Sequence, residues 1–196
     1  MVNVAMLGAS GRMGRTIIPL LHEAADLRLS GALAAPGDTA TGQDAGVLSG
    51  IAPLAMPITD DPAVALRGAE VAIDFTLPAA SIRHATLCIG QGCGMVIGTT
   101  GHDAAQRAQL EAAAGAIPIV IAPNMSLGVN LLLKLAELAA RALDEQYDIE
   151  IFEAHHRNKL DAPSGTALGL GRAAAGGRGR TLDELADYAR HGQTGV

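Results

Sequence analysis

The stretch that decides the fold is Val2-Asn-Val-Ala-Met-Leu7, followed at once by Gly8-Ala-Ser-Gly-Arg-Met-Gly14. The first six residues are almost all apolar, which is typical of a buried parallel strand. Apolar residues then recur at helical spacing, at Ile17, Ile18, Leu20 and Leu21. A strand, a glycine turn and a helix, in this order, indicate dinucleotide binding, because glycines let the backbone approach a pyrophosphate at the helix N-terminus. The spacing is G-x-x-G-x-x-G rather than G-x-G-x-x-G, so a purely structural turn remains the alternative.

Similar strand–helix units follow up to about residue 122. We expect strands at Leu27–Ala34, Met56–Thr59, Val71–Thr76, from Met95, and at Ile117–Ile121. We expect helices at Pro62–Arg67, from Pro78 and over 103–114, and a mobile loop over 36–50. This alternation predicts an α/β fold with an open, Rossmann-like parallel sheet, whose ligand crevice lies at the carboxyl ends of the strands. Three such ends carry polar or glycine residues, at Gly8–Gly14, Asp74–Thr76 and Gly98–Gly101, although each alone could be a plain turn.

The end of the second expected strand bears on the cofactor. A Rossmann site usually carries an Asp or Glu here to bind the adenosine ribose, but this chain has Ala34 and Ala35, and Asp38 lies further on. A missing carboxylate removes a repulsive charge against a 2′-phosphate, and Arg12 could contact that phosphate or the pyrophosphate. The sequence therefore favours NADPH over NADH.

The strongest expected helix spans Leu127–Leu143. Its apolar residues form a stripe wide enough for a core, at Leu131, Leu132, Leu135, Leu138 and Ala139. We place a domain boundary near residue 126. The prediction is a dinucleotide-binding domain at 1–126 and an α+β domain for substrate binding and oligomerisation at 127–196.

Residues 149–166 are the second informative stretch. Ile149–Phe152 alternates in the period-2 pattern of a strand, and titratable groups follow, among them His155, His156 and Lys159. Ser164 can then cap a helix over Ala167–Ala175, and another helix is expected to start at Thr181. A basic cluster in an acidic chain suggests acid–base chemistry on an anionic substrate. A solvated basic turn is the competing interpretation, and the spacing fits no usual metal motif.

Composition excludes several classes of function. Of 196 residues, 2% are aromatic and the formal net charge is −6, which argues against a nucleic-acid surface. The apolar runs are shorter than a membrane span. Two cysteines, Cys88 and Cys93, fit structural thiols in a reducing cytoplasm, and Met1 leads almost directly into a strand, which leaves no room for a signal peptide.

Taken together, these motifs resemble the dihydrodipicolinate reductase family. The resemblance rests on Gly8–Gly14, Asp74-Phe-Thr76, Gly98-Thr-Thr-Gly101, Ala122-Pro-Asn-Met-Ser-Leu-Gly-Val-Asn130 and, above all, Glu153-Ala-His-His-Arg-Asn-Lys-Leu-Asp-Ala-Pro-Ser-Gly-Thr166. It covers the chain from residue 2 onwards.

The resemblance implies reduction of 4-hydroxy-tetrahydrodipicolinate, a small cyclic dicarboxylate, by NADPH or NADH in lysine and diaminopimelate biosynthesis. It implies His155 as general acid, assisted by Lys159, and no metal. The residues implied for carboxylate binding are His156, Lys159, Ser164, Gly165 and Thr166. Those implied for cofactor binding are Gly8, Ser10, Gly11, Arg12, Met13, Gly14, Phe75, Thr76, Gly98, Thr99, Thr100, Ala122, Pro123, Asn124 and Met125.

Family members assemble as tetramers, and they continue beyond the length of this chain, so we expect a form truncated at its carboxyl end. Two alternatives stay open. One is a non-catalytic NAD(P)-binding protein, and the other is a Rossmann reductase of a different acidic imine or semialdehyde.

Overall fold

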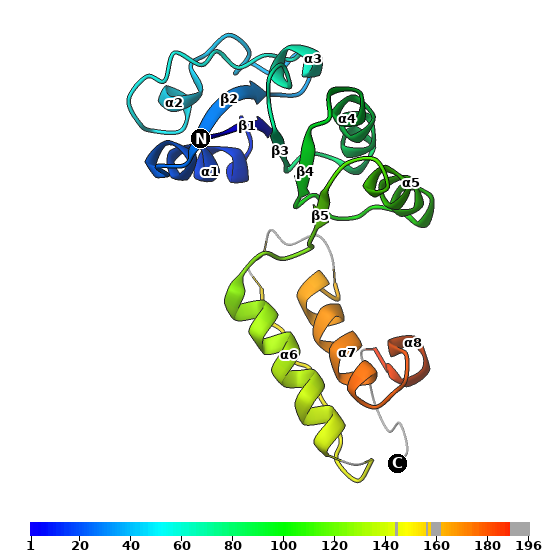
Figure 1. Ribbon diagram of the computed structural model, residues 1–196. Helices are drawn as coiled ribbons and strands as arrows, with labels where there is room; N and C mark the ends of the chain where they lie inside the picture. Colours follow the sequence, from blue (N-terminus) through cyan, green and yellow to red (C-terminus); the bar gives the residue numbers. More distant parts are fainter. Residues whose placement is uncertain (144, 156, 158–161, 189–196) are drawn as a thin grey trace. The chain divides into compact units, whose positions relative to one another are not determined.

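The computed structural model describes the chain except for residues 144, 156, 158–161 and 189–196 (Figure 1). It consists of two compact units, Met1–Pro123 and Asn124–Val196. No helix in the described part of the chain combines the length and the hydropathy that crossing a membrane requires.

The first unit is built on a five-stranded parallel sheet in the order β2-β1-β3-β4-β5. The strands are β1 (Val2–Leu7), β2 (Leu27–Leu33), β3 (Val71–Asp74), β4 (Gly94–Ile97) and β5 (Ile119–Ile121). The last residues of neighbouring strands are register partners, since Leu7 pairs with both Leu33 and Asp74, and Ile97 pairs with Asp74 and Ile121. The carboxyl ends therefore form one level edge, and the predicted Rossmann-like sheet is confirmed.

The sheet is packed against apolar residues on both faces, which explains why successive residues of β1 are almost all apolar. Leu7 belongs to a core shared with Cys88 of α4, whereas the adjacent Met6 packs with Ile18 of α1 in a second core. The helices of this unit are α1 (Arg12–Glu23), α2 (Ala45–Leu48), α3 (Pro62–Ala65), α4 (Pro78–Gln91) and α5 (Ala104–Ala114). Cys88 and Cys93 are both free and fully buried, on either side of the turn that joins α4 to β4.

The region between β2 and β3 differs from the sequence prediction. Met56–Thr59 is not a strand, because it makes only single bridges, Thr59 to Leu33 and Pro57 to Asp44, and proline cannot extend a ladder. The expected mobile loop over 36–50 contains the short helix α2. The Asp44 carboxylate orders it by accepting hydrogen bonds from the N–H groups of four residues, which are Gly46, Val47, Leu54 and Met56.

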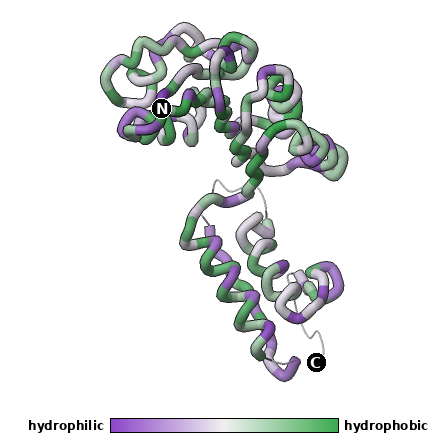
Figure 2. Tube along the Cα trace, viewed as in Figure 1, coloured by the Kyte–Doolittle hydropathy of each residue, from purple (hydrophilic) through white to green (hydrophobic). Residues whose placement is uncertain are grey.

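The second unit contains α6 (Leu127–Ala142), α7 (Gly165–Gly177) and α8 (Leu182–Leu185), and α6 packs against α7. The expectation that the leucine stripe of α6 is core was wrong for this chain. Leu131 is 60% exposed and Leu135 is 52% exposed. The cause is that α7 packs against another face of α6, where its glycines approach Leu133, Glu137 and Ala140. Figure 2 shows hydrophobic residues recurring along the length of α6.

The strand predicted at Ile149–Phe152 does not form either. A strand requires a neighbour to pair with its backbone groups, and the described residues of this unit offer none. Ile149 and Ile151 are exposed, and Phe152 is 92% exposed.

Candidate functional site

The glycine turn after β1 is packed too closely to accept side chains. Gly8 has φ +87°, and a Cβ there would lie 2.5 Å from the carbonyl oxygen of Phe75. A Cβ on Gly14 would lie 2.3 Å from the carbonyl oxygen of Gly8. The turn therefore folds onto itself and onto the end of β3, and its bare backbone fits the close approach of a pyrophosphate.

Helix α1 begins directly at this turn, with Gly11 as its N-cap and no side-chain hydrogen bond to the cap. Its first N–H groups and the exposed Arg12 can thus face an anion. At the neighbouring β2 end, the hydroxyl of Ser10 donates to Asp38 Oδ2 at 2.7 Å, and Arg15 Nε donates to the carbonyl of Ser10 at 3.0 Å.

Asp38 is thus held against the glycine turn, although it lies five residues beyond β2. The hydrogen bond from Ser10, and then that from the N–H of Ala40, lower the pKa of the Asp38 carboxyl below its usual value. An ionised carboxylate therefore stands beside Ser10.

A pocket of about 350 Å³ lies at the carboxyl edge of the sheet. It brings together residues from the three strand ends expected to converge, namely Gly11, Arg12, Met13, Phe75, Thr76, Leu77, Pro78, Gly98, Thr99 and Thr100. The Phe75 ring lies against Gly98, where a Cβ would come within 2.1 Å of the ring. The β3 and β4 ends are therefore packed together beneath the pocket.

Asp74 is fully buried under this pocket and accepts hydrogen bonds from four residues. Its Oδ1 accepts from the Thr76 hydroxyl at 2.7 Å, the Thr99 hydroxyl at 2.7 Å and the Ser81 hydroxyl at 3.0 Å. Its Oδ2 is 2.7 Å from His84 Nδ1. Burial alone raises the pKa of Asp74, but the hydrogen bonds from His84 and two threonine hydroxyls together lower it below its usual value.

The remaining expected cofactor residues follow β5. Ala122 and Pro123 end the first unit, and Asn124 and Met125 begin the second. Asn124 is engaged locally, since its Oδ1 accepts from the N–H of Ser126, the N-cap of α6.

In the second unit, Glu153 joins His155 to the start of α7. Its Oε1 accepts from the N–H of Ser164 at 2.9 Å, and its Oε2 is 2.8 Å from His155 Nε2. Ser164 caps α7 as predicted, because its Oγ accepts from the N–H of Ala167. His155 is exposed and can meet a substrate.

Of the other carboxylate-binding candidates, Gly165 and Thr166 form the first turn of α7, and a Cβ on Gly165 would meet open space. His156 and Lys159 lie outside the described residues. The structure thus relates His155 to Ser164 through Glu153, a link that the sequence did not specify.

We expect the Glu153 link to be sensitive to acid. Hydrogen bonds from the side chain of Ser164, from His155 and from the N–H of Ser164 lower the pKa of Glu153 to about 2. Because this value lies below the usual one of about 4.3, the link stabilises the folded unit at neutral pH and is lost as the pH falls from about 4.3 towards 2. A carboxyl ¹³C titration assigned with Glu153→Gln should give a midpoint well below 4. A midpoint at about 4.3 would show that the link is absent.

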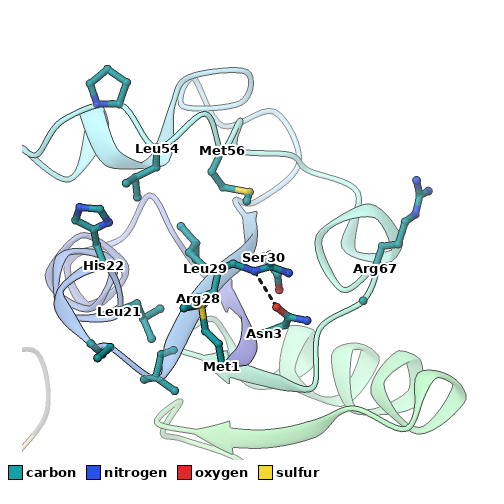
Figure 3. Close-up of a pocket in the computed structure, with 15 residues that line it drawn as sticks. Met1, Asn3, Leu21, His22, Arg28, Leu29, Ser30, Leu54, Met56 and Arg67 are labelled. Carbon is teal, nitrogen blue, oxygen red and sulfur yellow. Dashed lines mark hydrogen bonds between the residues drawn. The ribbon is translucent and has the colours of Figure 1, made fainter.

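A second hollow, of about 910 Å³, lies at the opposite edge of the first unit (Figure 3). It is lined by residues near the amino ends of β1 and β2, including Asn3, which accepts from Arg28 Nε at 2.9 Å. Ligands of open parallel sheets bind at the carboxyl ends, so this hollow is not the candidate site.

Comparison with known proteins decides the family. Residues 2–125 match the family model described as dihydrodipicolinate reductase, N-terminus, and residues 128–195 match the one described as dihydrodipicolinate reductase, C-terminus. The chain belongs to the dihydrodipicolinate reductase family. The expected resemblance is thereby confirmed over both halves of the chain.

Individual dihydrodipicolinate reductases agree with this assignment. The chain is 52% identical over 194 residues to the 4-hydroxy-tetrahydrodipicolinate reductase of Thiobacillus denitrificans, covering 99% of this chain and 72% of that protein. It is 54% identical over 192 residues to that of Alkalilimnicola ehrlichii, covering 98% of this chain and 72% of the relative. Among solved structures, the dipicolinate-bound dihydrodipicolinate reductase of Paenisporosarcina sp. TG-14 matches with a TM-score of 0.71 and 29% identity, over 91% of this chain and 67% of that one.

Sequence reasoning missed two residues that bind Asp74 beneath the candidate pocket. Ser81 and His84 lie three residues apart on α4, on the same buried face as Ala85 and Cys88. Two polar residues on an otherwise apolar helix face are a signal for a buried hydrogen-bond partner, and Asp74 is that partner.

Proposed function

We propose that the chain catalyses reduction of 4-hydroxy-tetrahydrodipicolinate to tetrahydrodipicolinate by NAD(P)H, in lysine and diaminopimelate biosynthesis. The observation that carries this proposal is the family match over both halves, 2–125 and 128–195, at about 50% identity to named reductases. We assign cofactor binding to residues 1–126 and substrate binding to 127–196.

The glycine turn and the pocket beside it fit a dinucleotide. We propose that the turn, through the residues Gly8, Ser10, Gly11, Arg12, Met13 and Gly14, holds the pyrophosphate. The nicotinamide end is assigned to Phe75, Thr76, Gly98, Thr99, Thr100, Ala122, Pro123, Asn124 and Met125. When bound, the cofactor supplies the hydride, and the protein supplies orientation and charge.

The substrate side needs a proton donor and carboxylate binders. The 4-hydroxyl of the substrate must leave as water, which gives a conjugated imine ring. Hydride addition to this ring leaves an electron-rich enamine carbon, and we propose that His155 protonates it. Because the ionised Glu153 only accepts hydrogen bonds, it holds one proton of His155 on Nε2. The proton given to the substrate is therefore the second one, on Nδ1 of the imidazolium form, and the ring is left neutral with its Nε2 proton in place. We assign the substrate carboxylates to Ser164, Gly165 and Thr166 at the start of α7, together with His156 and Lys159, and Lys159 also assists protonation.

The preference between NADPH and NADH depends on the positive and negative side chains near the end of β2. We propose NADPH as the preferred cofactor, because Arg12 and Arg15 flank the turn and no carboxylate follows β2 directly. Asp38 limits this preference, because its carboxylate beside Ser10 repels a 2′-phosphate and can accept from a ribose hydroxyl.

Replacing Asp38 by asparagine should therefore raise the ratio of NADPH affinity to NADH affinity about tenfold, as expected for one screened charge near a phosphate. Binding titrations of both cofactors measure this ratio. Asp26→Asn makes the same charge change just before β2, at the opposite end of the strand, and should leave the ratio unchanged. An unchanged ratio in Asp38→Asn would place the ribose elsewhere.

The function itself is tested by the oxidation of NADPH and NADH by the purified 196-residue chain, supplied with freshly made product of dihydrodipicolinate synthase. Turnover supports the proposal. Binding of NADPH without turnover would make the chain a non-catalytic NAD(P)-binding protein. Activity only on another imine or semialdehyde would assign it to a different substrate.

We also propose that the protein works in the cytoplasm as a homotetramer. The exposed leucines of α6 and the 92% exposed Phe152 supply apolar surface for association. Sedimentation equilibrium should give a mass above the 19.9 kDa of one chain, and a strictly monomeric mass at micromolar concentration would refute the tetramer.

A further inference from the structure

The buried Asp74 side chain has two unequal oxygens. Oδ1 accepts from three hydroxyls and from the N–H of Thr76 at 3.0 Å, whereas Oδ2 has one partner within the described residues, His84 Nδ1 at 2.7 Å. Rotation of a carboxylate about its Cβ–Cγ bond moves both oxygens together. The His84 contact therefore fixes the orientation in which Oδ1 meets the other donors.

Two of those donors line the candidate cofactor pocket. Thr76 follows β3 and Thr99 follows β4, and they are also joined directly, since the N–H of Thr76 donates to Thr99 Oγ1 at 2.8 Å. The position of the pocket wall is thus tied to a carboxylate whose orientation depends on an α4 side chain outside the pocket. His84 is buried and is absent from the pocket lining.

Because Asp74 is buried, breaking its contact with His84 costs free energy. An ionised carboxylate in the protein interior is stable only with its partners in place, and removing one partner leaves an uncompensated charge. If His84 is lost, the carboxylate can turn towards its remaining donors or admit water, and either response moves the threonines that it holds.

We propose that His84 is a positioning residue, which acts through Asp74 to hold Thr76 and Thr99 in the geometry that binds the nicotinamide half of the cofactor. This inference rests on the proposed function for its consequence, but the positioning itself can be measured without cofactor. Because His84 is buried outside the pocket lining, it acts only through Asp74.

The experiment compares His84→Ala with His84→Asn, whose side-chain amide can place a donor near the position of Nδ1. We expect His84→Ala to weaken NADPH binding at least about tenfold and to lose amide-exchange protection at Thr76. His84→Asn should restore the NADPH affinity and the Thr76 protection to within about threefold of the wild-type values. Leu66→Ala is the control for lost stability, because it empties a buried site on the loop before β3 and should lower the melting temperature without changing either readout.

Each outcome has a separate meaning. Equal loss of stability in His84→Ala and Leu66→Ala, with normal NADPH binding and normal Thr76 protection, would overturn the proposal and leave Asp74–His84 as a core ion pair only. Failure of His84→Asn to restore Thr76 protection would overturn it as well. If the wild-type chain binds neither NADPH nor NADH, the proposed function fails, while Thr76 protection still reports whether His84 positions the loop.

Discussion

Replacing His155 by alanine lowers kcat at least about a hundredfold, which is the low end for loss of a general acid. The imidazole is exposed, and its Nε2 is 2.8 Å from Glu153, so Nδ1 is the nitrogen that can deliver a proton. Because Glu153 also accepts from Ser164, the acid is oriented relative to the proposed carboxylate-binding turn. Steady-state kinetics with saturating NADPH and freshly made substrate measure the effect.

Two comparisons separate chemistry from folding in that experiment. Binding of NADPH should be unchanged in His155→Ala, because no cofactor contact is assigned to this side chain. His22→Ala removes another exposed histidine, at the end of α1, and should retain wild-type kcat. A near-wild-type kcat in His155→Ala would remove it from the role of general acid.

Gly14→Ala is expected to abolish useful cofactor binding, with at least about a hundredfold loss of affinity, because displacing a binding group by about 1 Å can have an effect of this size. The new Cβ would lie 2.3 Å from the carbonyl oxygen of Gly8 and 2.6 Å from Ala9 Cα. Both contacts are with backbone, so the turn itself must move. We expect a loss of about 3 kcal/mol in stability and a melting temperature lower by about 10 °C.

The matched control is Gly90→Ala. Gly90 lies on the exposed side of α4, and a Cβ there would meet no atom within 4 Å. The change should be neutral or stabilise the helix by up to about 1 kcal/mol, with unchanged NADPH affinity. Calorimetry and a binding titration distinguish the two variants. Wild-type affinity in Gly14→Ala would show that the turn does not carry the pyrophosphate.

The sequence predicts the parts of the fold whose causes are local. The turn at Gly8–Gly14, the proline that opens α4 and the Ser164 cap of α7 are each specified by a few neighbouring residues, and each appears where expected. The convergence of the strand ends could also be predicted, because parallel strands bring their carboxyl ends to one edge. These elements carry most of the candidate site.

The sequence predictions that were wrong or missing concern features that depend on residues distant in the chain. Ile149–Phe152 alternates like a strand, yet alternation cannot supply the neighbour that a strand needs. The leucines of α6 form a core-like stripe, but α7 packs against another face of α6, at Leu133 and Ala140, and the pattern within α6 cannot specify that choice. Asp38 was noted only as lying beyond the second strand, and His84 was missed, for the same reason: their roles come from contacts with Ser10 and Asp74, 28 and 10 residues away in the chain.

The two buried thiols allow local opening of the first unit to be measured by chemical labelling. Cys88 and Cys93 have no solvent exposure, and they are the only cysteines among 196 residues. A thiol-reactive dye can therefore modify the chain only when the α4–β4 region of the first unit opens. The rate of labelling thus reports the local opening of the first unit without any engineered probe. Its slowing by NADPH would give an affinity even for a variant that has lost turnover.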